Sequence, residues 1–235
     1  MATLLLPLAG PMQAWGTRSR FDQRDTELMP SKSGVLGLLA AALGIERSDW
    51  ASLEPLTHLK MGVREDKVGL LSVDYHTAEE REHPGTLAKA HKTAISKRYF
   101  LADAVFLVGL EGNRQDLTAI YEALKNPRWP LFLGRKAFVP GYPVYFAKIE
   151  NALHDAPLEE VLKGFPWIGG AFLLDSVQDE KAPEGTLRLF LEQSEESSPA
   201  PIVLHIQDQP VAAFSERQYR YRQINVYTVE IGGKS

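Results

Sequence analysis

The stretch SKSGVLGLLAAALG, residues 31–44, is the clearest helix signal in this 235-residue chain. Ser31 stands where a helix N-cap is expected, and Gly44 suits the position that follows the last turn. The apolar side chains between them recur with helical spacing, so one face of this helix is predicted to be buried. The segments on both sides of the helix decide which fold it belongs to.

Apolar runs on either side of this helix predict β-strands. Residues 3–9 form the first strand, in which Pro7 cannot donate a ladder hydrogen bond and therefore predicts an edge or a bulge. After the helix, residues 57–65 and 68–75 are predicted as two strands around a turn. The continuous apolar run over residues 102–110 is typical of a buried strand.

The remaining elements of the first 149 residues complete a known order. Residues 114–126 form a second helix by their apolar spacing, and 131–149 is predicted as a loop followed by a strand. A polar, irregular insertion at about 76–98 separates the second and third strands. The order is the β-α-β-β-α-β pattern of ferredoxin-like folds, which also underlies the RNA-recognition sheet. We therefore predict an α+β protein with a ferredoxin-like (RRM-like) N-terminal domain over residues 1–149 and an insertion within it.

Residues 150–235 are predicted to form a small, β-rich C-terminal domain. A short helical signal at 157–165 is followed by strand-like runs that turn signals separate. Residues 150–196 carry 11 acidic and three basic side chains, whereas the rest of the chain has a net charge of +4. Because local patches steer a polyanion more than the total charge does, the net charge of −4 does not exclude a nucleic-acid partner.

Composition excludes several classes of protein and site. The chain has no cysteine, which rules out disulfides and thiolate metal sites, and its six histidines lack metal-ligand spacing. The GxSxG, GxGxxG and HExxH motifs do not occur. The apolar N-terminus is short and lacks a basic region, and no apolar run reaches the length of a membrane span. We expect a cytoplasmic protein with no metal, no cofactor and no membrane partner.

The loop GPMQAWGTRSR, residues 10–20, combines residue types that suit single-stranded nucleic acid. Trp15 offers a stacking face, and Gln13 has the groups to hydrogen-bond a base edge. Arg18 and Arg20 are suited to phosphate oxygens. The alternative is a structural loop with Trp15 packed in the core, and composition does not decide between the two.

The start of the 31–44 helix is a second candidate. Free backbone N–H groups at a helix N-terminus attract anions, so Ser31, Lys32 and Ser33 form a candidate phosphate seat. Ordinary capping by Ser31 is the alternative.

Two basic segments, 87–100 and 125–138, supply the remaining candidates, and the first of them contains no acidic residue. A run of charge is often just a solvated surface, but here it lies in the insertion of an RNA-binding topology. The candidate RNA contacts in the two segments are Lys89, His91, Lys92, Lys97, Arg98, Arg135 and Lys136. The neighbouring His91 and Lys92 also have the chemistry of a base and a charge stabiliser in a metal-independent ribonuclease.

Several motifs together make the sequence recognisable, and the match is continuous over roughly residues 1–149. They strongly resemble the CasD family, the small RAMP-type subunits of the type I-E CRISPR surveillance complex, Cascade. The motifs are LAGPMQAWG, PSKSGVLGLLAAALGI, VDYHT, KRYFLADAVF and PLFLGRKAF.

The resemblance implies a function as well as a fold. It implies a modified RRM whose insertion is a thumb, and a non-catalytic subunit that holds the 5′ handle of the guide RNA (crRNA) in antiviral defence. The implied partners are the crRNA and the backbone and large subunits of Cascade, with target DNA reached only through the complex. Relatives in type I-C systems process precursor crRNA, so an endoribonuclease that uses His91 and Lys92 is the alternative.

Overall fold

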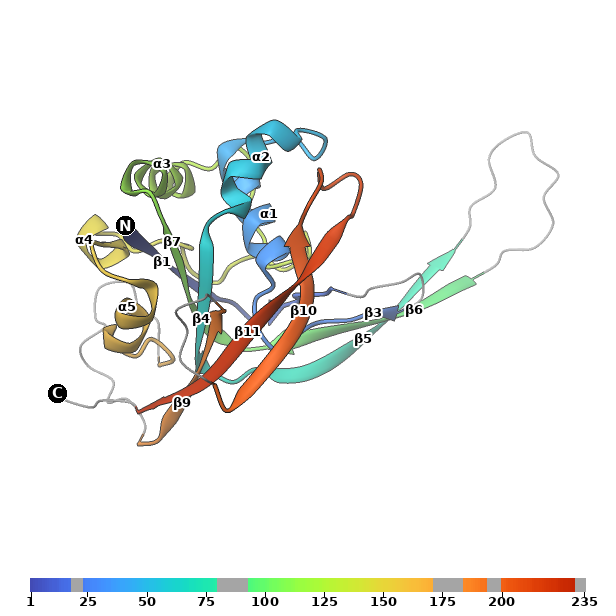
Figure 1. The fold of residues 1–235 in the computed structure, drawn as a ribbon. Helices are drawn as coiled ribbons and strands as arrows, with labels where there is room; N and C mark the ends of the chain where they lie inside the picture. Colours follow the sequence, from blue (N-terminus) through green and yellow to red (C-terminus); the bar gives the residue numbers. More distant parts are fainter. Residues whose placement is uncertain (18–22, 80–92, 171–183, 194–199, 231–235) are drawn as a thin grey trace.

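The computed structural model describes residues 1–17, 23–79, 93–170, 184–193 and 200–230. Figure 1 shows a mixed α+β fold with one large sheet, helices packed against it and a long two-stranded arm. The strands are β1 (Ala2–Ala9), β2 (Met12–Gln13), β3 (Gln23–Arg24), β4 (Lys60–Lys67), β5 (Leu70–Glu79), β6 (Thr93–Ala102), β7 (Val105–Gly112), β8 (Leu153–His154), β9 (Thr186–Glu192), β10 (Ile202–Pro210) and β11 (Tyr219–Glu230). The helices are α1 (Lys32–Leu43), α2 (Trp50–Thr57), α3 (Arg114–Lys125), α4 (Ile149–Ala152) and α5 (Leu158–Gly164).

The large sheet runs through both halves of the sequence. Its seven strands lie in the order β10-β11-β9-β4-β7-β1-β8, and every neighbouring pair is antiparallel. The joint between the halves is the pairing of β4 with β9, in which Val63 lies opposite Phe190. The β-rich character predicted for the C-terminal part is confirmed, and its strands continue the sheet of the N-terminal strands.

Helices cover both faces of this sheet. Leu191 and the α5 side chain Leu162 both approach Gly62 of β4, where an added Cβ would lie 2.7 Å from Leu162. The next residue along β9, Glu192, points to the opposite face and pairs with Lys32 of α1. Glycine in the middle of β4 thus allows α5 to pack closely, and the core extends to both sides of the sheet.

The two predicted long helices are confirmed, together with their ends. The Ser31 hydroxyl accepts a hydrogen bond from the Gly34 N–H at the start of α1, and Gly44 ends it with a φ of 76°. Asn113 caps α3 by accepting from the N–H of Gln115. Helix α2 was not predicted from the sequence.

The first strand is regular despite its proline. Pro7 lies opposite Leu107 of β7 in an unbroken register. On the other side of β1, β8 pairs with Thr3 and Leu4, so Pro7 lies beyond the end of β8. The predicted edge is confirmed, and the alternative of a bulge is wrong.

The arm consists of β5 and β6, and it extends away from the body of the molecule (Figure 1). The short strands β2 and β3 pair with β6 at its base and along its length. The prediction that residues 57–65 and 68–75 pair around a turn is wrong, because β4 pairs with β7 and β9 while β5 pairs with β6. The irregular structure predicted for 76–98 is also wrong at both of its ends, which are strands, and its centre lies outside the described residues. Residues 131–148 form a loop without the predicted strand.

Candidate nucleic-acid interface

The loop that follows β1 has a structural role, and we call its residues 13–15 the brace. The Gln13 amide nitrogen donates to the backbone oxygens of Leu8 at 3.2 Å and Ala104 at 2.8 Å. Its amide oxygen accepts from Trp15 Nε1 at 3.2 Å. The Gln13 side chain is fully buried and Trp15 is 1% exposed. Neither is presented to a base, so the expected RNA contacts are wrong here and the core alternative is correct.

Trp15 fixes the position of α1. A Cβ added at Gly34 would lie 2.8 Å from Trp15 Cε3, so only glycine at this position lets the helix pack against the indole. The backbone of Trp15 is also held, because its N–H donates to Thr26 Oγ1 at 2.9 Å and its carbonyl accepts from the N–H of Glu27. The brace therefore joins β1, the segment before α1 and α1 itself.

The start of α1 is occupied by carboxylates of the protein. The Lys32 N–H donates to Asp208 Oδ2 at 2.6 Å, and Lys32 Nζ lies 3.1 Å from both carboxylate oxygens of Glu192. Lys32 is 2% exposed, and Ser31 is equally buried as the helix cap. The phosphate seat predicted from Ser31 and Lys32 is wrong, because internal anions take the place of the phosphate. Ser33, the third residue of that prediction, is half-buried and borders a groove described below.

These groups belong to a buried ionic network that joins α1 to the C-terminal strands. Arg222 Nε donates to Asp208 Oδ1 at 2.6 Å and Nη2 donates to Oδ2 at 2.8 Å, while Nη1 lies 3.6 Å from Glu192. Burial lowers the pKa of the Lys32 ammonium below its usual 10.5, and the charge of Glu192 opposes that shift. The network therefore has a structural role.

Positive charge converges instead at the inner end of the arm. Arg24 of β3 lies opposite Arg98 of β6 in parallel register. Arg135 reaches them from the loop after α3, where its Nη2 donates to the backbone oxygens of Arg24 at 3.2 Å and Tyr99 at 2.8 Å. We call Arg24, Arg98 and Arg135 the arginine cluster. Partial burial and the like charges of Arg98 and Arg24 lower the pKa of the Arg135 guanidinium.

A glycine holds Arg135 in place. Gly134 has a φ of 87°, and a Cβ at this position would lie 1.6 Å from the backbone oxygen of Ala14 in the brace. The Arg135 guanidinium also lies over the Phe138 ring, 5.4 Å from its centroid. The turn therefore sets a cation beside two others at a fixed geometry, which is favourable for binding an anion that bridges them.

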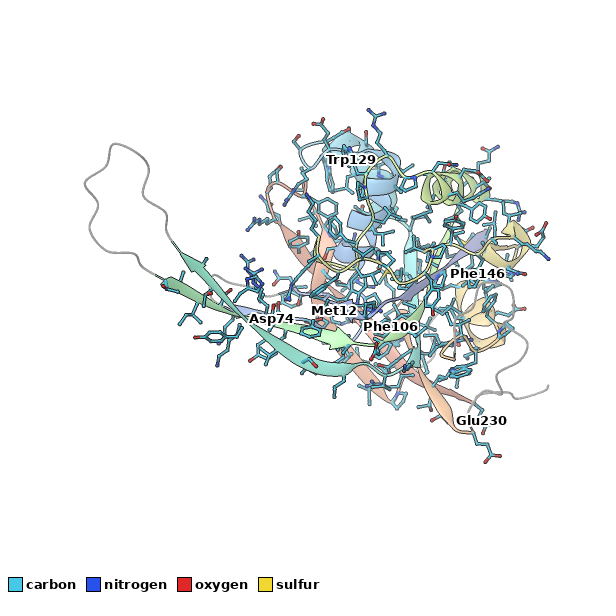
Figure 2. All side chains as sticks on the ribbon, turned by 180° about the vertical axis from the view of Figure 1, so that it is seen from behind. Met12, Asp74, Phe106, Trp129, Phe146 and Glu230 are labelled. Carbon is cyan, nitrogen blue, oxygen red and sulfur yellow. The ribbon has the colours of Figure 1, made fainter. Side chains whose placement is uncertain are left out.

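The surroundings of the cluster extend its charge and also limit it. Lys97 of β6 precedes Arg98 in the sequence, Lys136 follows Arg135, and both lysines are exposed to solvent. Asp74 of β5 lies opposite Arg98 and 3.4 Å from His76, so one carboxylate borders the cluster on the arm (Figure 2). Sequence reasoning identified Arg98 and Arg135 but missed Arg24, which joins them through the short strand β3.

A groove of about 940 Å³ begins at the arginine cluster and follows α1. Its floor is the small-residue face of α1, including Gly34, Gly37 and Ala41. Its walls come from the loop after α3 and from the turn between β10 and β11. The aromatic side chains that border it are Trp15, Trp129, Phe132, Phe214 and Tyr219, and the arginines are Arg24, Arg47 and Arg135.

Several predicted contacts lie outside the described residues: Arg18, Arg20, Lys89, His91 and Lys92. The pair proposed for ribonuclease chemistry, His91 and Lys92, is among them. Within the parts of the chain that the structure describes, no group of three or more acidic or histidine side chains could hold a metal ion. No helix in those parts is long and apolar enough to cross a membrane.

Comparison with known proteins gives matches to CRISPR-associated proteins. The profile of a family described as CRISPR-associated protein (Cas_Cas5) matches residues 3–227. The "CRISPR system Cascade subunit CasD" of Escherichia coli (strain K12) is 38% identical over an alignment of 154 residues that covers 60% of this chain and 69% of that protein.

Two solved structures extend the match to the fold. One, described as "Crystal structure of Cas protein", is 44% identical with a TM-score of 0.74, over 97% of this chain and 95% of that one. The other, a chain of a "CRISPR RNA-guided surveillance complex", is 34% identical with a TM-score of 0.74, over 97% of this chain and 90% of that one.

Proposed function

Because the chain belongs to the Cas5 family of CRISPR-associated proteins, we propose that it is a subunit of a CRISPR RNA-guided surveillance complex and binds the guide RNA there. Its partners are the crRNA and the other Cascade subunits, including the backbone and large subunits. It reaches target DNA only through the complex. The segment of RNA that it holds is the 5′ handle.

The observation that carries this proposal is the arginine cluster at the mouth of the α1 groove. Arg24, Arg98 and Arg135 come from three separate segments, and the Arg135 guanidinium is anchored by two backbone carbonyls. Converging like charges disfavour one another in the free protein, so an anion that bridges them is stabilised. A single-stranded RNA supplies such anions at regular intervals, together with bases that are free to stack.

The topology supports the same proposal. The strands β4-β7-β1-β8 lie in the order of a ferredoxin-like sheet, with α1 and α2 between β1 and β4, and α3 between β7 and β8. We infer that this part is an RRM-like unit. The β5–β6 arm between β4 and β7 then corresponds to the thumb insertion.

Salt dependence of RNA binding tests the proposal. For single strands, log K falls as log salt rises, and this negative slope becomes less steep by about 0.7 for each phosphate contact removed. Arg24→Gln with Arg98→Gln should therefore flatten the slope for a fluorescein-labelled, repeat-derived single-stranded RNA by about 1.4. Arg135 is not substituted in this test, because its side chain also donates hydrogen bonds to the backbone oxygens of Arg24 and Tyr99.

Arg114→Gln is the matched control, because Arg114 is exposed at the start of α3 and pairs with Asp155. An unchanged slope in the double variant, or an equal change in the control, would contradict RNA binding at the cluster.

We propose a non-catalytic role in this binding. The same RNA should stay intact when the protein is incubated with it in EDTA. Cleavage that disappears in His91→Ala would replace this proposal with the ribonuclease alternative.

A further inference from the structure

We infer that the groove along α1 receives one unpaired base of the bound RNA and holds it by stacking, not by reading the edge of the base. This inference rests on the proposed function, since it requires that RNA phosphates lie at the arginine cluster. It assigns a separate role to the groove itself.

The side chains of the groove suit a flat aromatic ring. Trp129 is 39% exposed at the rim, and Phe214 and Tyr219 border the opposite wall from the β10–β11 turn. Stacking of a base on an aromatic side chain stabilises binding by about 1–3 kcal/mol and tolerates every base, because each base has a π-face. An exposed tryptophan beside a groove of this size is therefore a fitting contact for a nucleobase.

The floor of the groove leaves room for a ring to approach the helix backbone. A Cβ added at Gly37 would meet no atom within 4 Å, so the face of α1 is open there. Ala41 continues this face toward the end of the helix. The hydroxyl of Ser31, which also borders the groove, already accepts a hydrogen bond as the helix cap. A floor of small apolar residues favours stacking over recognition of base edges.

Backbone hydrogen bonds fix one wall to α1 and the other to the segment that follows α1, before any ligand binds. The N–H groups of Arg128 and Trp129 donate to the backbone oxygens of Ala42 at 2.9 Å and Ala41 at 3.1 Å, which places Trp129 beside the last turn of the helix (Figure 2). On the other side, the N–H of Ser215 donates to the Arg47 oxygen at 3.0 Å. A preformed groove lowers the entropic cost of ordering a bound base.

The charges place the groove next to the path of the RNA backbone. Arg24 and Arg135 belong to the arginine cluster and also border the groove. A nucleotide whose phosphate lies at these two residues has its base within reach of the groove. A second cavity, of about 420 Å³, borders α2 and the β10–β11 turn. It does not offer the same site, because the Lys32 ammonium that borders it is already paired with Glu192.

A groove-filling variant tests this inference in the full-length protein. Gly37→Leu adds a side chain at the groove, at a position where an added Cβ meets no atom within 4 Å, and leucine also raises helix propensity. The probes are repeat-derived single-stranded RNAs with one abasic residue at each position in turn. We expect one position at which the abasic change weakens wild-type binding about tenfold, which corresponds to about 1.4 kcal/mol. Exchanging the base at that position should change affinity less than about threefold.

In Gly37→Leu the intact RNA should bind about tenfold more weakly, and the abasic change at that position should have no further effect. Gly164→Leu is the matched control, because Gly164 is exposed at the end of α5 and an added Cβ there also meets no atom within 4 Å. It should bind both RNAs as the wild type does. Trp129→Ala should show the same loss of the abasic effect, which keeps the test valid if Gly37→Leu unfolds.

The outcomes separate this inference from the proposed function. If the arginine variants flatten the salt dependence but no abasic position responds to Gly37→Leu, the inference is wrong and RNA binding stands. If Gly37→Leu leaves RNA affinity unchanged but weakens assembly with other subunits, the groove binds protein and the inference is again wrong. If the wild-type protein shows no salt-dependent RNA binding, both fail together.

Discussion

Removal of one buried carboxylate should destabilise the whole molecule, and Asp208→Ala is the sharpest perturbation of this kind. Asp208 is fully buried and accepts three hydrogen bonds, from the Lys32 N–H and from Nε and Nη2 of Arg222. In the variant, the buried Arg222 keeps Glu192 at 3.6 Å as its ion-pair partner. The first turn of α1 also loses its anion.

The size of the effect follows from these contacts. Breaking a buried ion pair by removal of one partner costs about 3–5 kcal/mol, because the other charge stays buried. Most domains unfold with a free energy of about 5–15 kcal/mol, so this is a large share of the total. For a chain of this size each kcal/mol shifts Tm by about 2–4 °C, and we expect a fall of about 6–20 °C.

Chemical unfolding followed by tryptophan fluorescence and circular dichroism measures this loss. Asp155→Ala is the matched control, because Asp155 is 70% exposed and pairs with Arg114 at the surface. Exposed pairs contribute about 0–1 kcal/mol, so the control should remain close to the wild type. The reasoning would be refuted if the free energies of unfolding of Asp208→Ala and Asp155→Ala differed by less than about 1 kcal/mol, the upper limit for an exposed pair. It would also be refuted by a doubly substituted Asp208→Leu, Arg222→Met protein no more stable than the single variant, since the second change removes the buried guanidinium that has lost its two hydrogen bonds to Asp208.

Two further predictions concern Gly134 and Lys32. Gly134→Ala should destabilise the protein by at least about 2 kcal/mol in the same unfolding assay, because a φ of 87° is strained for alanine and the added Cβ would meet the Ala14 oxygen. The control is Gly37→Ala, in open space on α1, which should stabilise the protein by up to about 1 kcal/mol. Equal effects of the two substitutions on the free energy of unfolding would contradict this prediction. Lys32→Met tests the lowered pKa of Lys32. Between the folded-state pKa and 10.5, Lys32 is protonated in the unfolded chain but not in the folded protein. The free energy of unfolding of the wild type therefore increases as pH rises through that window. The stability of the wild type relative to Lys32→Met should therefore increase toward pH 10.5, and a difference independent of pH would show that burial does not shift this group.

The sequence predicted local structure where the signal lies within a few residues. The caps of α1 at Ser31 and Gly44 and of α3 at Asn113 are local contacts, and both helices are confirmed. The partners of β4 were not predictable in this way, because β9 joins it from more than 120 residues away. Helix α2 was missed because Pro55 lies inside it, and proline normally opposes a helix interior.

Burial decided which candidate site residues are available to a ligand, and the sequence contains little information about burial of polar groups. The partners of Gln13 and Lys32 are Ala104 and Glu192, which lie 91 and 160 positions away along the chain. A glutamine in the core and one at a binding surface therefore look alike in the sequence. Arg24 was missed for the same reason, since its place beside Arg98 depends on the pairing of β3 with β6.

The loop after β1, which carries the recognisable motif, and the arginine cluster are therefore different residues. A series of packing contacts connects them. Trp15 sets the position of α1 through the close contact with Gly34. The neighbouring Ala14 sets the turn at Gly134, because its oxygen occupies the space of a Cβ there. That turn presents Arg135 to the arginine cluster, while α1 presents its open face to the groove. The brace thus fixes two parts of the proposed interface relative to each other, although Gln13 and Trp15 are themselves buried.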